Sequence, residues 1–331
     1  MYNVTIVLDD ADHTAFAVFF GQLAKAYHVH LMMEWTPVPS VGSYYGKYLS
    51  HLILGYPWLV GSDYYVFIRS LSWFYPTAQL NTMASEIYEL INGTYPSSKV
   101  ALLYMTMLGD TYDDWRYLVS ELSLIPKGLF NVNNEYAYYP FNIITVNELA
   151  LGLVNLSSYK YIILMVPEKL IPSNVRSIIN QWRSKGGVLI PFNSNWLRNG
   201  LGGVLSSIEE PAITVNASVE VFPIINNNSL FLAINNYGNP INCLHINVNL
   251  TALGLHNSTY AVINLNGGDL LNVTSGNLIS FNVNLYDTMS AVIVGIIPVK
   301  PINISINVSN ASASYNDESG VFNIKINGLI S

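Results

Sequence analysis

Strands that alternate regularly with helices between residues 98 and 192 constrain the fold of this chain more than any other feature. Apolar runs typical of buried strands recur there, separated by segments with helical spacing, at about 30 residues per unit. Such alternation predicts a doubly wound α/β domain, a parallel sheet covered by helices. The expected strands are residues 100–105, 141–146, 161–166 and 188–192, and the expected helices are residues 112–124, 147–154 and 173–184.

The pattern changes on both sides of this α/β region. Before it, apolar runs at residues 4–8, 29–33 and 64–68 end in polar or charged residues, and helix-like segments separate them. Such runs are typical of buried parallel strands. After Pro211 the helical pattern stops, and short apolar runs divided by turn-forming Asn and Gly predict a β-sandwich. Its expected strands are residues 219–222, 230–234, 245–250, 260–265, 278–283 and 290–296. We therefore expect four parts: residues 1–96, 97–205, 211–298, and a tail or extra strands over 299–331.

The composition excludes several classes of partner. Charged residues make up 11% of the chain, against a usual share of about 25%. The net charge of −7 and the pI of about 5.3 leave no basic footprint for nucleic acid. No apolar run reaches the roughly 18 residues that a membrane span requires. Cys243 is the only cysteine and the histidines lack a ligand spacing, so we expect no disulfide, no metal and no cofactor.

Asparagine-linked glycosylation motifs indicate the compartment. The chain contains eleven Asn-x-Ser/Thr sequons, eight of them after residue 210, which favours an extracellular or cell-surface glycoprotein. Chance accounts for roughly half of such motifs in a chain this rich in Asn, Ser and Thr. The first residues, Met1-Tyr2-Asn3-Val4, lack the basic and apolar regions of a signal peptide. We therefore expect an exported protein of which upstream residues are missing.

A carboxylate beside aromatic residues is the sharpest candidate for chemistry. The apolar run 29–33 is followed by Glu34, Trp35, Thr36 and Pro37. This order predicts a carboxylate at the carboxyl end of a parallel strand, where barrel enzymes keep their catalytic groups. The alternative is a strand-end glutamate in a solvated loop. The next expected strand leads to Trp73, so an indole is expected beside Glu34, and aromatic rings beside an acid suit sugar binding.

A cluster of three acids, Asp9, Asp10 and Asp12, ends the first expected strand and could reach the same site. Clustered acids are more often part of a solvated loop or a helix cap. We take Asp10 as a candidate substrate-binding residue together with Trp35 and Trp73.

The chain resembles the C-terminal part of family 42 β-galactosidases and related clan A glycoside hydrolases. The resemblance to the last two strands of their (β/α)₈ barrel rests on residues 33–37, residues 61–65 and Trp73. Residues 98–192 resemble the family's trimerisation domain, which has a class I amidotransferase-like, flavodoxin-like fold, and the C-terminal sandwich is similar in place and size. The resemblance implies that Glu34 is the nucleophile, that Trp73 lines the sugar subsite and that the chain forms homo-oligomers, as a trimer.

One departure from the family, the absence of most of the barrel, limits what the chain can do alone. A retaining glycosidase needs a second carboxylate about 5 Å from the first, and the family carries it on a barrel strand for which this chain has no residues. The α/β region has no cysteine, so amidotransferase chemistry lacks its nucleophile. We expect a portion of an exported retaining β-glycosidase that acts on oligo- or polysaccharides and is inactive without an upstream barrel segment. The alternative is a non-catalytic, glycosylated surface protein for carbohydrate binding or assembly.

Overall fold

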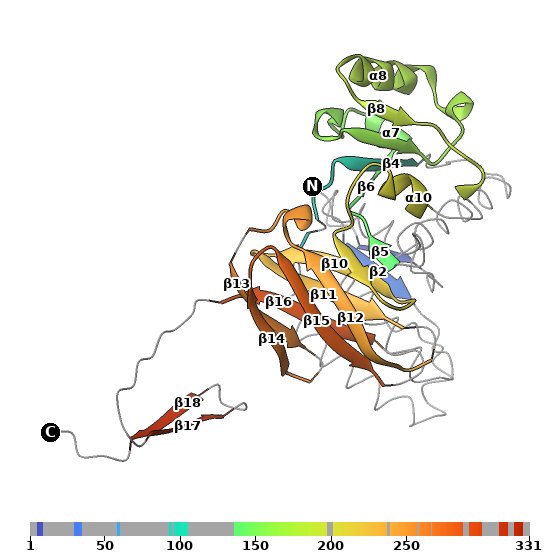
Figure 1. Cartoon of the computed structure of the whole chain (residues 1–331). Helices are drawn as coiled ribbons and strands as arrows, with labels where there is room; N and C mark the ends of the chain where they lie inside the picture. The colour runs from blue at the N-terminus through green and yellow to red at the C-terminus, as the bar shows by residue number, and fades with distance from the viewer. Residues whose placement is uncertain are drawn as a thin grey trace. The chain divides into compact units, whose positions relative to one another are not determined.

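The computed structural model describes much of the 331-residue chain (Figure 1). The described residues are 5–8, 30–34, 58–59, 93–94, 96–104, 136–196, 201–236, 239–256, 258–265, 267–286, 291–299, 311–316 and 321–326. The chain divides into two units, residues 1–298 and residues 299–331. In the second unit, strands β17 (Ala311–Asn316) and β18 (Val321–Ile326) form an antiparallel pair.

The first part of the chain contributes a parallel sheet of three strands in the order β1-β2-β3. Strands β1 (Thr5–Leu8) and β2 (His30–Glu34) confirm the first two expected strands. Strand β3 (Trp58–Leu59) was not expected from the sequence. The strand expected at residues 64–68 and both expected helices of this region lie outside the described residues.

A second parallel sheet has four strands in the order β6-β4-β7-β8. The sequence predicted all four strands. It also predicted the helices that follow β6 and β7 in the chain. The helix expected at residues 112–124 lies outside the described residues. The elements are β4 (Val100–Tyr104), β6 (Asn142–Thr145), α7 (Val146–Ala150), β7 (Tyr161–Leu164), α8 (Ser173–Ser184) and β8 (Val188–Ile190). Short 3-10 turns, η1 (Leu156–Ser158) and η2 (Glu168–Leu170), flank β7.

Strand β4 is buried on both faces, as expected for the interior of a parallel sheet. Ala101 and Leu103 belong to the core that includes residues of α7 and α8, so these two helices cover the same face (Figure 1). Val100, Leu102 and Tyr104 belong to a second core that continues into the C-terminal sheets. Every side chain of β4 therefore lies in apolar surroundings.

A capping box starts helix α7 directly after strand β6. The backbone N–H of Thr145 donates to Glu148 Oε2 at 2.6 Å, and the backbone N–H of Glu148 donates to Thr145 Oγ1 at 3.2 Å. Each side chain thus satisfies an N–H group that the first helical turn leaves without a partner. This reciprocal pair explains why both polar side chains are buried.

Two antiparallel sheets share the second core and form a β-sandwich. Their strand orders are β10-β11-β16-β13-β14 and β15-β12-β9-β5. The strands are β5 (Tyr136–Tyr138), β9 (Ile213–Val215), β10 (Glu220–Asn226), β11 (Ser229–Asn235), β12 (Ile241–Asn249), β13 (Thr259–Asn264), β14 (Asp269–Ser275), β15 (Leu278–Leu285) and β16 (Ala291–Pro298). Helix α10 (Gly202–Ser206) precedes β9, and the 3-10 turn η3 (Thr251–Leu253) follows β12.

Two backbone pairings join the sandwich to segments that precede it in the chain. Strand β5 lies between β4 and β6 in the chain, yet it pairs with β9 at the edge of a sandwich sheet. On the other sheet, Thr94 exchanges two backbone hydrogen bonds of 2.8 Å with Ile225 of the edge strand β10. Gly93 permits this approach, because a Cβ there would lie 2.1 Å from the carbonyl oxygen of Ile225. The segment therefore covers part of an exposed sheet edge.

Candidate functional site

Glu34 is the last residue of β2, at the carboxyl end of a parallel strand. Its Cα partner is Leu59 of β3, and the preceding residue, Met33, pairs with both Leu8 of β1 and Trp58 of β3. Because the three strands run parallel, their carboxyl ends meet at one edge of the sheet. The backbone thus places Glu34 where the sequence analysis expected it.

The other three predicted site residues, Asp10, Trp35 and Trp73, lie outside the described residues. The proximity of Trp73 to Glu34 stays a prediction.

Trp58 is a residue near Glu34 that the sequence analysis missed. Its position in β3 is paired with Met33, one residue before the carboxylate. The run Tyr56-Pro57-Trp58-Leu59-Val60 is apolar and aromatic and could have indicated a short strand. A proline within a short run argues against a strand, so the pattern of these residues does not mark one.

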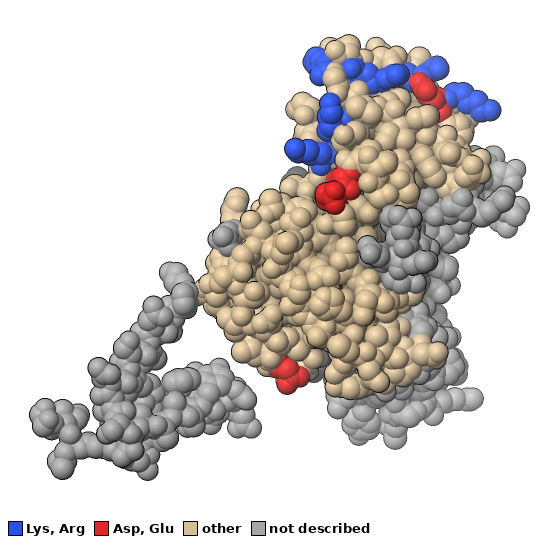
Figure 2. All heavy atoms as spheres, viewed as in Figure 1, with Lys and Arg blue, Asp and Glu red and all other residues tan. Residues whose placement is uncertain are grey.

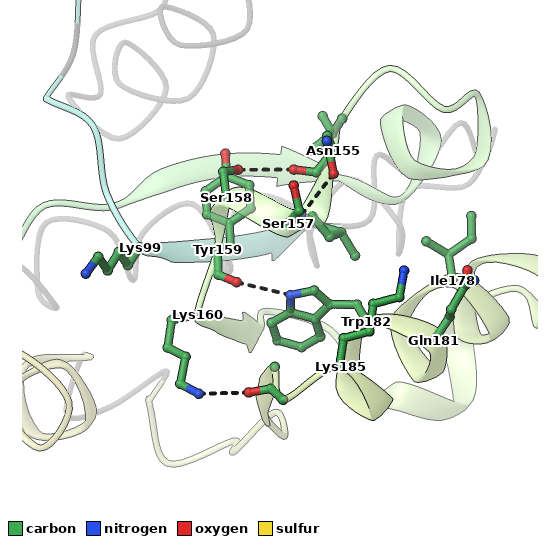
Figure 3. A pocket seen from close by; sticks show the side chains of 14 residues that line it. Lys99, Asn155, Ser157, Ser158, Tyr159, Lys160, Ile178, Gln181, Trp182 and Lys185 are labelled. Atoms are coloured by element: carbon green, nitrogen blue, oxygen red, sulfur yellow. Dashed lines mark hydrogen bonds between the residues drawn. The ribbon is translucent and has the colours of Figure 1, made fainter.

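A groove of about 800 Å³ opens on the described α/β region, and Figure 3 shows it from close by. It lies where the 3-10 turn η1, the residues before β7 and the end of α8 come together. The fourteen lining residues are Lys99, Val154, Asn155, Leu156, Ser157, Ser158, Tyr159, Lys160, Ile178, Gln181, Trp182, Lys185, Gly186 and Gly187.

The floor of the groove is held by the indole of Trp182. Its Nε1 donates to the backbone oxygen of Tyr159 at 3.1 Å, and the ring is almost fully buried. Gly187 packs against this ring, since a Cβ there would lie 2.2 Å from Cε2 of the indole. The ring therefore shapes the groove but is not exposed as a platform for stacking.

Hydrogen bonds also hold the rim of the groove. Asn155 Oδ1 accepts from the backbone N–H of Ser157 at 3.0 Å, and Ser158 Oγ donates to the backbone oxygen of Asn155 at 3.1 Å (Figure 3). Lys160 Nζ donates to the backbone oxygen of Gly186 at 2.8 Å. Burial, and secondarily the charge of Glu148, raises the pKa of the Tyr159 phenol, so that phenol stays neutral. The groove is preorganised and lined by neutral polar groups and ammonium groups.

A half-buried carboxyl, Glu209, has the strongest electrostatic perturbation among the acids of the described chain. Desolvation by burial raises its pKa from 4.5 to about 7. Its Oε1 atom is buried without a hydrogen-bond partner within the described residues. The pKa of Tyr138 is raised by burial and further by the charge of Glu209. Such perturbed groups occur at functional sites and also in purely structural settings.

Metal ligands do not gather in the described part of the chain. No group of three or more His, Cys, Asp or Glu side chains that could hold a metal ion occurs among the described residues. Cys243 is an exposed free thiol at an irregularity in strand β12. In the same described residues, no helix is long and apolar enough to span a membrane.

The comparisons with known proteins link the fold to glycosidases. No family model matches the chain, and no curated protein matches it. Among solved structures, a rhamnosidase from Novosphingobium sp. PP1Y matches 94% of this chain with 11% identity and a TM-score of 0.52. A β-galactosidase from Bacillus circulans sp. alkalophilus matches 88% with 12% identity and a TM-score of 0.51. These matches span 36% and 60% of the two known chains, respectively.

A family 42 β-galactosidase from G. stearothermophilus is also similar, with 11% identity over 88% of this chain and a TM-score of 0.47. We draw no argument from this weaker match. The two stronger matches establish that the chain has a glycoside hydrolase-like fold and spans only part of the length of those enzymes.

Proposed function

We propose that the chain is a portion of an exported retaining β-glycosidase of the β-galactosidase type, with Glu34 as the catalytic nucleophile. The observation that carries the proposal is the position of Glu34 as the last residue of a parallel strand, between two parallel neighbours. In (β/α)₈ barrels the catalytic groups come from the carboxyl ends of the strands. The glycosidase fold of the structural neighbours supports the same reading.

The topology of the first part supports its assignment as the C-terminal part of a (β/α)₈ barrel, residues 1–96. Strands β1, β2 and β3 are adjacent in chain order and parallel. The connections, residues 9–29 and 35–57, are long enough for the crossover helices that parallel strands require.

The strand order of the second sheet supports a flavodoxin-like domain, related to class I amidotransferases, over residues 97–205. In chain order the sheet is arranged 2-1-3-4, all parallel. Flavodoxin-like sheets begin with the same order. By the family resemblance this domain mediates trimerisation, and residues 211–298 form the last domain, a sandwich to which β5 adds an edge strand.

The chemistry that we propose is a double displacement at the anomeric carbon of the sugar. The Glu34 carboxylate attacks that carbon while a second carboxyl group, about 5 Å away, protonates the departing oxygen. General acid help of this kind contributes about 10² to 10⁴ in rate. No residue of this chain corresponds to the second carboxyl of the family, so we expect that the chain alone does not turn over substrate. Trp73, Trp35 and Asp10 are the proposed contacts to the sugar.

The proposed location is extracellular or at the cell surface, and the sequon at Asn227 supports it. Asn227 is exposed. Asn272, in contrast, donates from Nδ2 to the backbone oxygen of Ser280 at 3.0 Å. We expect a glycan on Asn227 and none on Asn272, in glycopeptides analysed by mass spectrometry from the cells that make the protein. An unmodified Asn227 peptide would contradict the location.

The proposed nucleophile is tested by assaying aryl β-galactosides with the chain alone and with the polypeptide encoded together with its upstream sequence. We expect no turnover by the chain alone, and turnover by the longer polypeptide that falls at least 10³-fold in Glu34→Gln. Azide added to Glu34→Ala should restore turnover and yield a glycosyl azide of inverted configuration, as a missing nucleophile predicts.

Glu210→Gln is the matched control, because Glu210 is an exposed glutamate of the α10–β9 connection. It should retain full activity. A longer polypeptide whose Glu34→Gln variant stays fully active would overturn the assignment of Glu34.

A further inference from the structure

Cationic side chains are concentrated in one part of this acidic protein. Residues 96–104 and 136–196 contain six of them, whereas no Lys or Arg occurs between residues 199 and 299. The same α/β residues contain only two carboxylates, Glu148 and Glu168, and Glu148 is buried in its capping box. Figure 2 shows the blue Lys and Arg atoms gathered over α8 and the adjoining loops. The α/β region therefore carries a local positive surface.

Three of these cations line the groove around Trp182. Lys99 precedes β4, Lys160 precedes β7 and Lys185 ends α8, so three separate segments bring their lysines to one cavity. The backbone oxygen of Lys99 accepts from the N–H groups of Lys160 and Tyr161 at 2.8 and 3.0 Å. The Lys160 ammonium is anchored on Gly186 at 2.8 Å. The backbone positions of the lysines are thus fixed by the fold.

No acidic side chain balances these lysines within the groove. None of its fourteen described lining residues is Asp or Glu, and no described carboxylate forms an ion pair with Lys99 or Lys185. Lys185 also lies at the carboxyl end of α8, where the helix dipole favours a cation. The helix dipole accounts for Lys185 but not for the presence of Lys99 and Lys160 in the lining of the same groove.

The rest of the lining suits a sugar ring better than a compact anion. Val154 and Ile178 provide partly buried apolar surface, and Ser157 and Gln181 provide a hydroxyl and an amide. Apolar patches pack against the C–H faces of pyranose rings, while hydroxyl and amide groups bond to sugar hydroxyls. A densely charged polyanion such as nucleic acid is disfavoured by the net charge of −7. A glycan with one carboxylate per ring offers sugar rings to the apolar and polar lining, and its charge is less dense than that of nucleic acid.

We propose that this groove binds acidic polysaccharides, in which uronate carboxylates pair with the ammonium groups of Lys99, Lys160 and Lys185. The site is separate from Glu34 and does not depend on the proposed hydrolysis. It gives the α/β region a binding role of its own, as a means of holding the protein on an acidic glycan.

The test is calorimetric titration of the full chain with short oligogalacturonates at low salt, compared with the same oligosaccharides as methyl esters. The esters keep the rings and remove the charges. We expect binding of the acids only, weakening as salt screens the pairs. Lys99→Gln and Lys185→Gln should each weaken binding about two- to fivefold, and the double variant about tenfold.

Lys169→Gln is the matched control, because Lys169 is an exposed lysine of the same region that does not line the groove. It should change the affinity less than twofold. The proposal is overturned if the acids do not bind, if the esters bind equally well, or if inorganic sulfate competes as strongly as the oligosaccharide. An equal loss in Lys169→Gln and Lys185→Gln would also overturn it, since binding would then follow overall charge rather than the groove.

Discussion

The parallel sheet of the α/β region and the antiparallel sheets of the sandwich bury their strands in different ways. All five residues of β4 are buried, alternately in two different cores. In β15, buried and exposed residues alternate strictly along all eight positions. The Lys and Arg side chains and the groove lie on the region with helical cover, whereas the sandwich is nearly uncharged.

Leucine-to-alanine substitutions in the two kinds of strand test this difference with the largest expected effect. Leu102 and Leu103 are both fully buried although they point to opposite faces, so each substitution should cost about 2 to 5 kcal/mol of unfolding free energy. In β15, Leu278 is 72% exposed while the next residue, Ile279, is buried. Leu278→Ala should therefore change stability by less than about 0.5 kcal/mol, and Ile279→Ala should cost about 2 to 5 kcal/mol.

Denaturant unfolding of the four variants measures these differences. A small effect in either Leu102→Ala or Leu103→Ala would show that β4 is not covered on both faces.

Glycine-to-alanine substitutions sharpen the same comparison with a smaller effect. A Cβ at Gly187, beside the groove, would lie 2.2 Å from the Trp182 ring, so Gly187→Ala should cost about 1 to 3 kcal/mol through overpacking. A Cβ at Gly295, in strand β16, would meet its nearest neighbour, Ile297 Cδ1, at 3.4 Å. Gly295→Ala should therefore be near neutral. Thermal melting of both variants measures the losses of stability. Equal losses in Gly187→Ala and Gly295→Ala would mean that Trp182 is free to move away.

The pH dependence of stability tests the buried carboxyl at the junction of α10 and β9. Because the folded state raises the pKa of Glu209 from 4.5 to about 7, it holds the proton more tightly than the unfolded state does. The contribution of Glu209 to the free energy of unfolding is therefore fully present below about pH 4.5 and is lost as pH rises to about 7. The loss should amount to about 1 to 2 kcal/mol, after a discount for partial exposure to solvent.

Glu209→Gln should remove this pH dependence and make the protein more stable than the wild type at pH 8. Urea unfolding at pH 5 and pH 8 measures both proteins. The burial of the carboxyl would be contradicted if the wild-type protein became more stable between pH 5 and pH 8 while the stability of Glu209→Gln did not change with pH.

Local patterns predicted most of the strands and helices that the structure describes. The helix expected at residues 173–184 is α8 without any change in its ends, and the strand expected at 100–105 is β4 with one residue fewer. Strand β14 was missed because it is a largely exposed edge strand, so its apolar residues Leu270 and Val273 do not mark a buried face. Strand β3 was missed because two residues are too short for any periodicity.

The two candidate sites differ in how visible they are in the sequence. The end of strand β2 at Glu34 could be predicted, because an apolar run that stops at a carboxylate is typical of the carboxyl end of a parallel strand. The catalytic role of Glu34 stays a prediction. The groove could not be predicted, because its lysines lie at positions 99, 160 and 185, and each follows an ordinary local pattern. Only the pairing of β4 with β7 and the packing of α8 bring them together.

The sequence by itself determined where chain segments become strands or helices and which of their faces are apolar, because that information repeats over a few neighbouring residues. The tertiary structure decided which segments pair. Strand β5 joins the sandwich through β9, more than seventy residues later in the chain, and Thr94 pairs with Ile225. Such contacts depend on the combined burial and hydrogen bonding of distant segments, which no local pattern contains.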